Sequence, residues 1–386
     1  MRQPKTKRIR FFLFIIGLFF FQEIEGHPMP NSVVNLYVTD QGIMGEAKMP
    51  LIDFETVFKK PKEKMDIQGS EIRRYFMDHI KIRSNSETWQ TSIDSIGIST
   101  TKDLVVGKYE ELWLTFSCKP LHETQARKFT FLYDVIIHQI INHKILVNVV
   151  QDWQGGILGG QRQVGEISLN IPQGRYYPLE INLEKGSWWK GFGSIIALGM
   201  QHIAEGTDHL LFLFVLLLPC MLLSQGNTWG SFGGVSYGIK NMLKIVTAFT
   251  LGHSITLFVG TFQWLKLPQQ IVEIWIAISI LLSAVHAYKP LFAHKEGWIA
   301  LCFGFIHGLA FASILMEMRF SNQFLVWSIL GFNVGIELMQ LLIILLVFPV
   351  IFWLSKKAYY HRLRKVGALL SFLMAGYWLI ERIFFF

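Results

Sequence analysis

The sequence predicts a membrane protein: an α-helical bundle of six transmembrane helices, preceded by a mainly β, sandwich-like extracytoplasmic domain. Three observations carry this prediction. The second half of the chain consists of apolar runs long enough to span a bilayer. The residues before it contain short segments rich in β-branched and aromatic residues, separated by turn residues. The chain begins with basic residues followed by an apolar run, as secretory signals do.

The composition excludes several classes of protein. Of the 386 residues, 51% are hydrophobic and 17% are charged, against a usual charged fraction of about 25%. This hydrophobicity excludes a disordered chain, and the apolar second half excludes a single soluble domain. The net charge is +8, but no basic stripe is interleaved with stacking aromatics, so we expect no nucleic-acid partner. The three cysteines form neither a disulfide framework nor a zinc pattern.

Residues 1–26 are predicted to be a signal peptide. Five basic residues precede the apolar core FFLFIIGLFFF, which is too short for a comfortable membrane span. Cleavage after Gly26 would expose His27, whose amine and imidazole would together chelate a metal. Two alternatives stay open: the segment is an uncleaved anchor, and the sequence HPMPN is only a processing site.

Residues 27–187 are predicted to form the extracytoplasmic domain. Strand-like segments lie at 33–38, 111–116, 128–137, 145–150 and 166–171, and a short helix is expected within 50–80. This pattern favours an antiparallel β-sandwich. His138 and His143 are expected on opposite faces of one strand, without a function. The domain would capture a ligand or dock an unidentified protein partner.

Residues 188–386 are predicted to form the transmembrane domain. Helices are expected at 192–218, 242–260, 268–288, 297–316, 325–354 and 366–385, with Trp188 and Trp189 at the interface. The Gly/Ser-rich connection 224–241 is expected to be flexible. Nine Lys and Arg residues fall in the first, third and fifth loops and two in the others. The positive-inside rule then places the β domain outside a cytoplasmic (inner) membrane.

The first predicted helix contains four ionisable residues within eight positions: His202, Glu205, Asp208 and His209. A central Asp in a membrane helix costs about 2.5–3.5 kcal/mol, so such residues are functional candidates. His202, Glu205 and His209 share one helix face, and Glu205 lies one turn from His209, close enough to hold one ion with it. His202 and His209 would be about 10.5 Å apart along an ideal helix. They can share an ion only if the helix is distorted, which Gly206 permits.

Further polar residues fall at a similar depth in the other helices. They are His253, His307, Asn333 and Glu337. Imidazole and carboxylate together suit a divalent transition metal such as Ni, Co, Cu or Zn, and equally suit a proton relay. The pairs Gly304/Gly308 and Gly331/Gly335 would let their helices approach neighbours closely. Snorkelling from helix ends explains Glu273, His286, Glu381 and Arg382.

Two motifs resemble those of a known family. His202-x5-Asp208-His209, with Gly206, is similar to the HPxxGxDH motif of the HupE/UreJ family, although Ile203 replaces its proline. Residues 305–310, FIHGLA, are similar to the family's FHGxAxGxE motif, without its terminal acid. The resemblance covers residues 190–386, and the larger family variant also has an extracytoplasmic domain. It implies a six-helix membrane protein linked to nickel or cobalt uptake.

The preferred hypothesis is a metal-ion permease, not an enzyme. Asp208, His209, His253 and His307 would form a midplane site, Asn333 and Glu337 would add ligands, and His202 and Glu205 would lie nearer the outer entrance. A rival hypothesis is an intramembrane metal-dependent hydrolase, in which three His and an Asp bind Zn and Ser254 or Glu337 assists water attack. The sequence has no HExxH or GxSxG motif. A receptor or assembly component dominated by the β domain is the third hypothesis.

Overall fold

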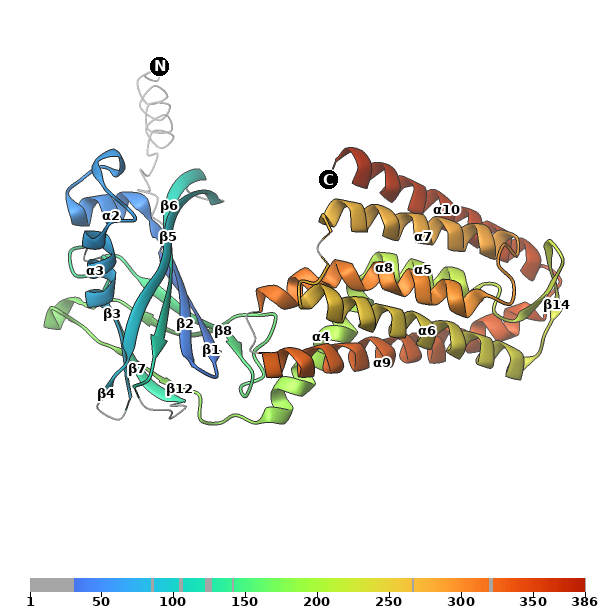
Figure 1. Ribbon diagram of the computed structural model, residues 1–386, viewed down its shortest axis with the longest axis horizontal. Helices are drawn as coiled ribbons and strands as arrows, with labels where there is room; N and C mark the ends of the chain where they lie inside the picture. Colours follow the sequence, from blue (N-terminus) through green and yellow to red (C-terminus); the bar gives the residue numbers. More distant parts are fainter. Residues whose placement is uncertain are drawn as a thin grey trace, which may run out of the picture.

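The computed structural model describes residues 31–84, 87–103, 107–121, 127–140, 142–265, 267–318 and 322–385. A mainly β N-terminal region is followed by a bundle of helices, and the two lie end to end along the long axis (Figure 1). The predicted signal peptide 1–26 and His27 lie outside the described residues. The signal peptide and the cleavage after Gly26 therefore stay predictions.

Two β-sheets form the N-terminal region. The larger has the strand order β5-β6-β2-β1-β8-β9 and the smaller has the order β12-β7-β3-β4. The strands of the larger sheet are β1 (Ser32–Thr39), β2 (Gly42–Pro50), β5 (Gln90–Asp103), β6 (Gly107–Lys119), β8 (Ile145–Asp152) and β9 (Arg162–Ile167). Those of the smaller sheet are β3 (Ile80–Ser84), β4 (Glu87–Thr88), β7 (Lys128–Tyr133) and β12 (Leu179–Asn182). The prediction of a wholly antiparallel sandwich was wrong at one place, because β1 and β8 pair in parallel.

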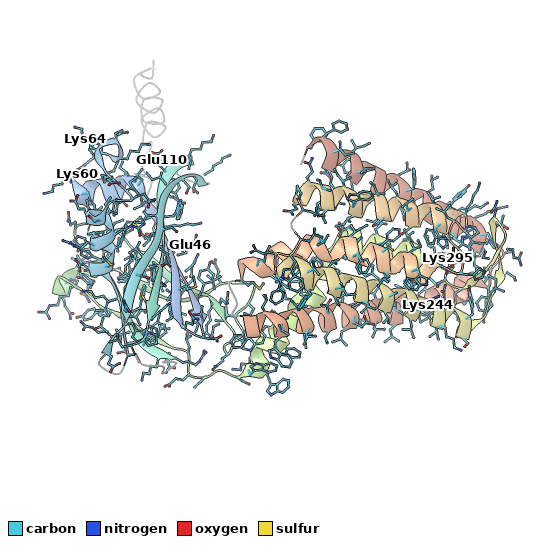
Figure 2. The ribbon with its side chains drawn as sticks, in the orientation of Figure 1. Glu46, Lys60, Lys64, Glu110, Lys244 and Lys295 are labelled. Atoms are coloured by element: carbon cyan, nitrogen blue, oxygen red, sulfur yellow. The ribbon has the colours of Figure 1, made fainter. Side chains whose placement is uncertain are left out.

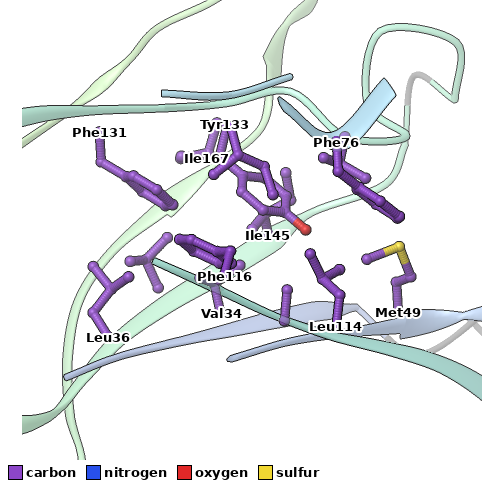
Figure 3. Packing of buried hydrophobic residues seen from close by; sticks show 14 of the residues in the cluster. Val34, Leu36, Met49, Phe76, Leu114, Phe116, Phe131, Tyr133, Ile145 and Ile167 are labelled. Atoms are coloured by element: carbon purple, nitrogen blue, oxygen red, sulfur yellow. The ribbon is translucent and has the colours of Figure 1, made fainter. Parts of the chain in front are cut away.

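The core of this region lies between the two sheets. Leu114 and Phe116 from β6 face Phe131 and Tyr133 from β7, and all four are buried (Figure 3). The rings of Phe116 and Phe131 stack with centroids 6.4 Å apart. A Cβ atom at Gly45 would lie 2.0 Å from the Phe116 ring, so β2 needs glycine where this ring packs. Buried residues alternate with half-buried ones along β6, so one face of this strand packs against the smaller sheet.

Two helices lie within the predicted helical stretch 50–80. They are α2 (Leu51–Phe58) and α3 (Ser70–His79), with a 3-10 turn at Lys62–Lys64 between them. Phe54 and Phe76 stack with centroids 5.4 Å apart and fix the two helices to the core. The remaining short elements are β10 (Leu169–Asn170), a 3-10 turn at Ile171–Gln173 and β11 (Arg175–Tyr176).

His138 and His143 do not lie on one strand, contrary to the sequence prediction. His138 lies in the turns that follow β7, and His143 lies just before β8. His143 Nε2 is 2.7 Å from the Ser32 hydroxyl, and its Nδ1 is 3.0 Å from Asp53 Oδ2. These groups have the order of a hydrolytic triad, but Ser32 has no exposed surface. The network therefore ties the start of β1 to α2.

The second half is helical. Its helices are α4 (Trp188–Glu205), α5 (Thr207–Leu217), α6 (Val235–Thr261), α7 (Gln269–Tyr288), α8 (Glu296–Glu317), α9 (Asn322–Ser355) and α10 (Tyr360–Phe384). By length and composition, α6, α7, α10 and residues Phe324–Ser355 of α9 can cross a membrane, whereas α5 and Glu296–Ala312 are shorter apolar helices. The chain is a multi-pass membrane protein.

Two predictions about the second half of the chain need correction, one about a helix and one about a connection. The segment 192–218 was predicted to be one span, but it is divided between α4 and α5 because Gly206 has a non-helical ψ of 92°. The connection 224–241 was predicted to be flexible, but it contains the hairpin of β13 (Leu222–Gln225) and β14 (Thr228–Phe232). Trp229 is buried there and donates a hydrogen bond of 2.9 Å to the His286 carbonyl. Burial of this tryptophan holds the connection against the bundle.

Glycines let the helices pack closely, as the sequence predicted. A Cβ atom would lie 2.1 Å from the Phe249 carbonyl oxygen at Gly304 and 2.3 Å from the His253 carbonyl oxygen at Gly308. Gly335 meets the Ile196 carbonyl oxygen in the same way, at 2.1 Å. Helices α6 and α8, and helices α4 and α9, are therefore in backbone contact.

Basic residues lie at the end of the bundle far from the β region. Lys244 and Lys295 mark this end (Figure 2). Arg364, which was counted among the basic loop residues, is instead buried and donates to the carbonyl oxygens of Ala287 and Tyr288, at 2.9 Å for Tyr288. It caps the C-terminus of α7, where the last carbonyl groups have no partner within the helix.

An ion pair stabilises the part of the β region that lies next to the helix bundle. Arg127 makes two hydrogen bonds to the Asp152 carboxylate, at 2.9 and 2.8 Å, and a third to the Leu183 carbonyl at 2.8 Å. Beside it, Trp153 donates to the Trp188 carbonyl at the start of α4, at 3.1 Å. The Asp152 side chain is 1% exposed, so this arginine is the cationic partner of a buried carboxylate.

Replacing Arg127 with Ala is expected to destabilise the protein by about 3–5 kcal/mol, because it leaves a buried carboxylate without a partner. Equilibrium unfolding of the purified protein measures the effect. Lys144→Ala is the matched control, because the Lys144–Glu166 pair is exposed and such pairs contribute about 0–1 kcal/mol. Equal losses in the two variants would contradict the role given to the buried pair.

Candidate functional site: a histidine cluster in the helix bundle

The site is built around the interruption at Gly206. The Gly206 N–H donates to the His202 carbonyl and its carbonyl accepts from the Leu210 N–H, both at 3.0 Å. Its φ of −72° suits any residue, so backbone freedom does not explain the glycine. A Cβ atom there would lie 2.6 Å from His209 Nδ1. Glycine is needed because the His209 ring packs directly against the backbone.

The interruption brings His202 and His209 together. Their ring centroids are 4.6 Å apart, although an uninterrupted helix would separate the two residues by about 10.5 Å along its axis. The distortion that the sequence analysis required for a shared ion is therefore present. His202 belongs to the cluster itself rather than to a separate outer entrance.

Two more imidazoles complete the cluster. His253 from α6 lies 6.4 Å from His202, and His307 from α8 lies 5.2 Å from His209, measured between ring centroids. His209, His253 and His307 are buried. Several of their nitrogen atoms are buried without a hydrogen-bond partner: Nε2 of His202 and His209, both nitrogens of His253 and Nδ1 of His307. Because buried polar atoms are normally paired, this concentration needs an explanation.

Two of the remaining imidazole nitrogens make hydrogen bonds that orient their rings. His307 Nε2 is 3.1 Å from the Ser279 hydroxyl, and His209 Nδ1 is 2.9 Å from Asp208 Oδ1. Phenylalanine rings enclose the cluster with centroids 4.5–5.4 Å from the nearest imidazole: Phe212, Phe249, Phe311 and Phe332. These apolar rings exclude water, so a charge placed among them interacts strongly with its neighbours.

Asp208 has a cationic partner that sequence reasoning missed. One Arg382 nitrogen lies 3.0 Å from Glu273 Oε2 and 3.6 Å from Asp208 Oδ2. The interpretation of Glu273 and Arg382 as snorkelling residues was therefore wrong. A carboxylate within a membrane protein needs a partner, so the presence of Asp208 was itself a signal that a cationic residue lies nearby. The sequence could not identify it, because it comes from the far end of the chain.

Two predicted site residues, Glu205 and Glu337, lie outside the cluster. Glu205 is exposed and accepts from Gln201 at 2.8 Å, because the helix ends before another turn can bring it beside His209. Glu337 accepts from Thr247 at 3.3 Å. Asn333 lies beside the cluster instead: its side chain interacts with His253, and its amide donates to the Ile329 carbonyl of its own helix at 2.8 Å. No contact between Glu205 and His209 is recorded for the described residues, so their sharing of one ion stays a prediction.

The cluster is not a preformed chelate. Within the described ranges, no three His, Cys, Asp or Glu side chains are grouped so that they could hold a metal ion. The imidazole nitrogens are nevertheless the ligands that Ni, Co, Cu and Zn prefer. Side-chain rotation would have to accompany binding of a metal ion by these imidazoles.

Comparison with known protein families assigns this chain to one of them. A family model described as HupE / UreJ protein matches residues 179–382, which contain every residue of the cluster. The chain belongs to the HupE/UreJ family. This family is associated with nickel and cobalt transport. No curated protein and no solved structure matches the chain.

Replacing Gly206 with Ala is expected to lower stability by about 1–3 kcal/mol, because the added methyl group overlaps the His209 ring. Thermal unfolding of the purified HupE/UreJ protein measures this loss. Gly376→Ala in α10 is the control, because nothing lies within 4 Å of a Cβ atom there and alanine favours a helix. If both variants unfold at the same temperature, the close contact between Gly206 and His209 does not constrain the structure.

Proposed function

We propose that this HupE/UreJ protein is a permease that carries a divalent cation of the nickel or cobalt class across the cytoplasmic membrane. The observation that carries the proposal is the buried cluster of four imidazoles, with unpartnered nitrogens, beside the Asp208 carboxylate. Membership of a family associated with nickel and cobalt transport supports the same function. The cation is the cargo, and it would bind neutral imidazole and ionised carboxylate.

The position of the cluster suits transport. Interrupted membrane helices form substrate sites in several transporter folds, because their free ends and nearby side chains can contact an ion. Conduction also needs binding that is weak enough for release. The absence of a ready-made three-ligand group among the described residues is consistent with an ion that passes from ligand to ligand. In this account His202, His209, His253 and His307 bind successively with Asp208.

Arg382 would hold Asp208 while no cation is bound. Its second partner, Glu273, lies closer, at 3.0 Å against 3.6 Å for Asp208. An arriving cation can therefore replace the guanidinium at Asp208 while Glu273 retains it. This exchange keeps each carboxylate paired, which matters because an isolated charge is costly at membrane depth.

The topology is part of the proposal. The β region would lie outside the cytoplasm, and the end of the bundle that carries Lys244 and Lys295 would face the cytoplasm. A cation would then enter from the side of the β region. The predicted six transmembrane segments would include α4 and α5 together as the first and α8 as the fourth.

The rival hydrolase hypothesis has less support from the geometry. Ser254, the suggested assistant, donates to the Thr250 carbonyl of its own helix at 2.7 Å. Glu337 accepts from Thr247. Neither contacts the imidazoles in the contacts recorded for the described residues, whereas water attack needs a base within hydrogen-bond reach.

Replacing His307 with Ala, or Asp208 with Asn, is expected to reduce nickel accumulation by cells at least about tenfold, because each change removes a ligand or its partner. Glu205→Gln is the control and should retain uptake, since Glu205 is exposed outside the cluster. Accumulated metal is measured with protein levels matched by immunoblot. Normal uptake by both cluster variants would contradict the permease.

Replacing Arg382 with Gln is expected to lower both the apparent KM and the maximal rate of uptake, because Asp208 then lacks a competing cation and retains the cargo longer. Arg382→Lys preserves the charge and should recover most of the rate. Initial rates over a range of nickel concentrations separate the two constants. A rate loss with unchanged KM would show that Arg382 does not compete with the cargo.

A further inference from the structure

A second pair of histidines lies in the β region, far from the bundle in the sequence. His79 ends α3, and His138 lies in the turns that follow β7. Their rings stack with centroids 4.5 Å apart and an interplanar angle of 15°. The Tyr75 ring lies 4.4 Å from the His79 ring and supports the pair from one side. Neither histidine belongs to the proposed transport site.

One residue, Asp134, orients both imidazoles. His138 Nδ1 is 2.9 Å from the Asp134 carbonyl oxygen, and His79 Nδ1 is 2.7 Å from its carboxylate. A carbonyl oxygen only accepts, so His138 Nδ1 carries the proton and Nε2 has the lone pair. The amide of Gln139 lies 3.3 Å from His138 Nε2, which agrees with Nε2 as the acceptor.

The Asp134 carboxylate lies at the same nitrogen of His79, Nδ1, and the Tyr176 hydroxyl donates to its other oxygen. An ionised carboxylate accepts only, so Nδ1 of His79 donates and Nε2 keeps its lone pair. The His79 side chain is 24% exposed, and a solute can therefore reach it.

This pattern is the one that surrounds metal-binding histidines in proteins. A ligating imidazole usually donates its other N–H to a carboxylate or a backbone carbonyl, which fixes the ring and increases its basicity. His79 has the first kind of partner and His138 has the second. Nε2 is then the ligating atom of each ring, although the Gln139 amide must leave His138 Nε2 and the rings must tilt toward each other to share an ion.

We propose that His79 and His138 form a binding site for a divalent transition cation such as Zn²⁺, Cu²⁺ or Ni²⁺, which two imidazoles favour. Water completes the coordination, and the Gln139 amide moves away from His138 Nε2. Asp134 is the positioning residue for both ligands. The bound ion would connect the end of α3 to the turns after β7, and the site does not depend on transport through the bundle.

Equilibrium dialysis of the full-length protein against Zn²⁺ tests the proposal. The His307→Ala protein serves as the background, so that changes in the bundle do not affect the comparison. Adding His79→Ala and His138→Ala is expected to remove one bound Zn²⁺ per chain. Adding His361→Ala, which removes an exposed histidine of α10, should remove none. Adding Asp134→Asn should weaken this binding about 10–100-fold.

Thermal unfolding provides a second measurement. Zn²⁺ should raise the Tm of the His307→Ala protein and of the His361→Ala variant, because the ion binds only the folded site, but not that of the His79→Ala/His138→Ala variant. If the double variant fails to fold, His138→Gln replaces it. If Zn²⁺ binding is unchanged when these histidines are lost, the proposed site is wrong. That result would leave the transport proposal untouched, because metal uptake is measured separately with proteins whose bundle residues are intact.

Discussion

The interruption between α4 and α5 at Gly206 is the constraint on which the candidate site depends. In a bilayer, backbone groups must find partners within the protein, so a helix can break only where other groups replace the lost bonds. Here the Asp208 carboxylate accepts from the His209 N–H at 2.9 Å. The break converts a spacing of seven residues into a contact between two imidazole rings. Without it, His202 and His209 would lie at different depths.

The distances between the other imidazoles depend on helix packing. Lipid provides no hydrophobic force between helices, so close backbone contact and polar bonds must hold them. Gly308 packs against the carbonyl oxygen of His253, a site residue, and Gly304 packs against that of Phe249 one turn away. The interface that joins α6 to α8 therefore also fixes His253 beside the cluster. Helix packing and the candidate site use the same residues.

Sequence reasoning anticipated what depends on local pattern. β-branched segments indicated the strands β1, β6, β7 and β8, and apolar runs indicated the helices. It could not foresee the parallel pairing of β1 with β8, because no local signal specifies a partner more than a hundred residues away. Hydropathy also described α4 and α5 as one span, since Gly206 is compatible with a straight helix as well as a broken one.

The sequence predicted which residue types form the candidate site, but not all of the individual residues that belong to it. Histidines at similar depth in several helices identified the cluster. The exposure of Glu205 follows from the residue at which α4 ends, which periodicity does not determine. Arg382 and Glu273 lie near helix ends, where a snorkelling residue and a partly buried ion pair have the same sequence pattern. Only the fold distinguishes the two.

Ion flux through the purified protein tests the central claim most directly. The wild-type protein is reconstituted into liposomes, and entry of radioactive nickel is compared with that into protein-free liposomes and with entry of Mg²⁺. The account predicts saturable nickel entry and no comparable entry of Mg²⁺, because imidazole ligands favour transition metals. Nickel entry no faster than in protein-free liposomes, with folded protein inserted, would contradict it.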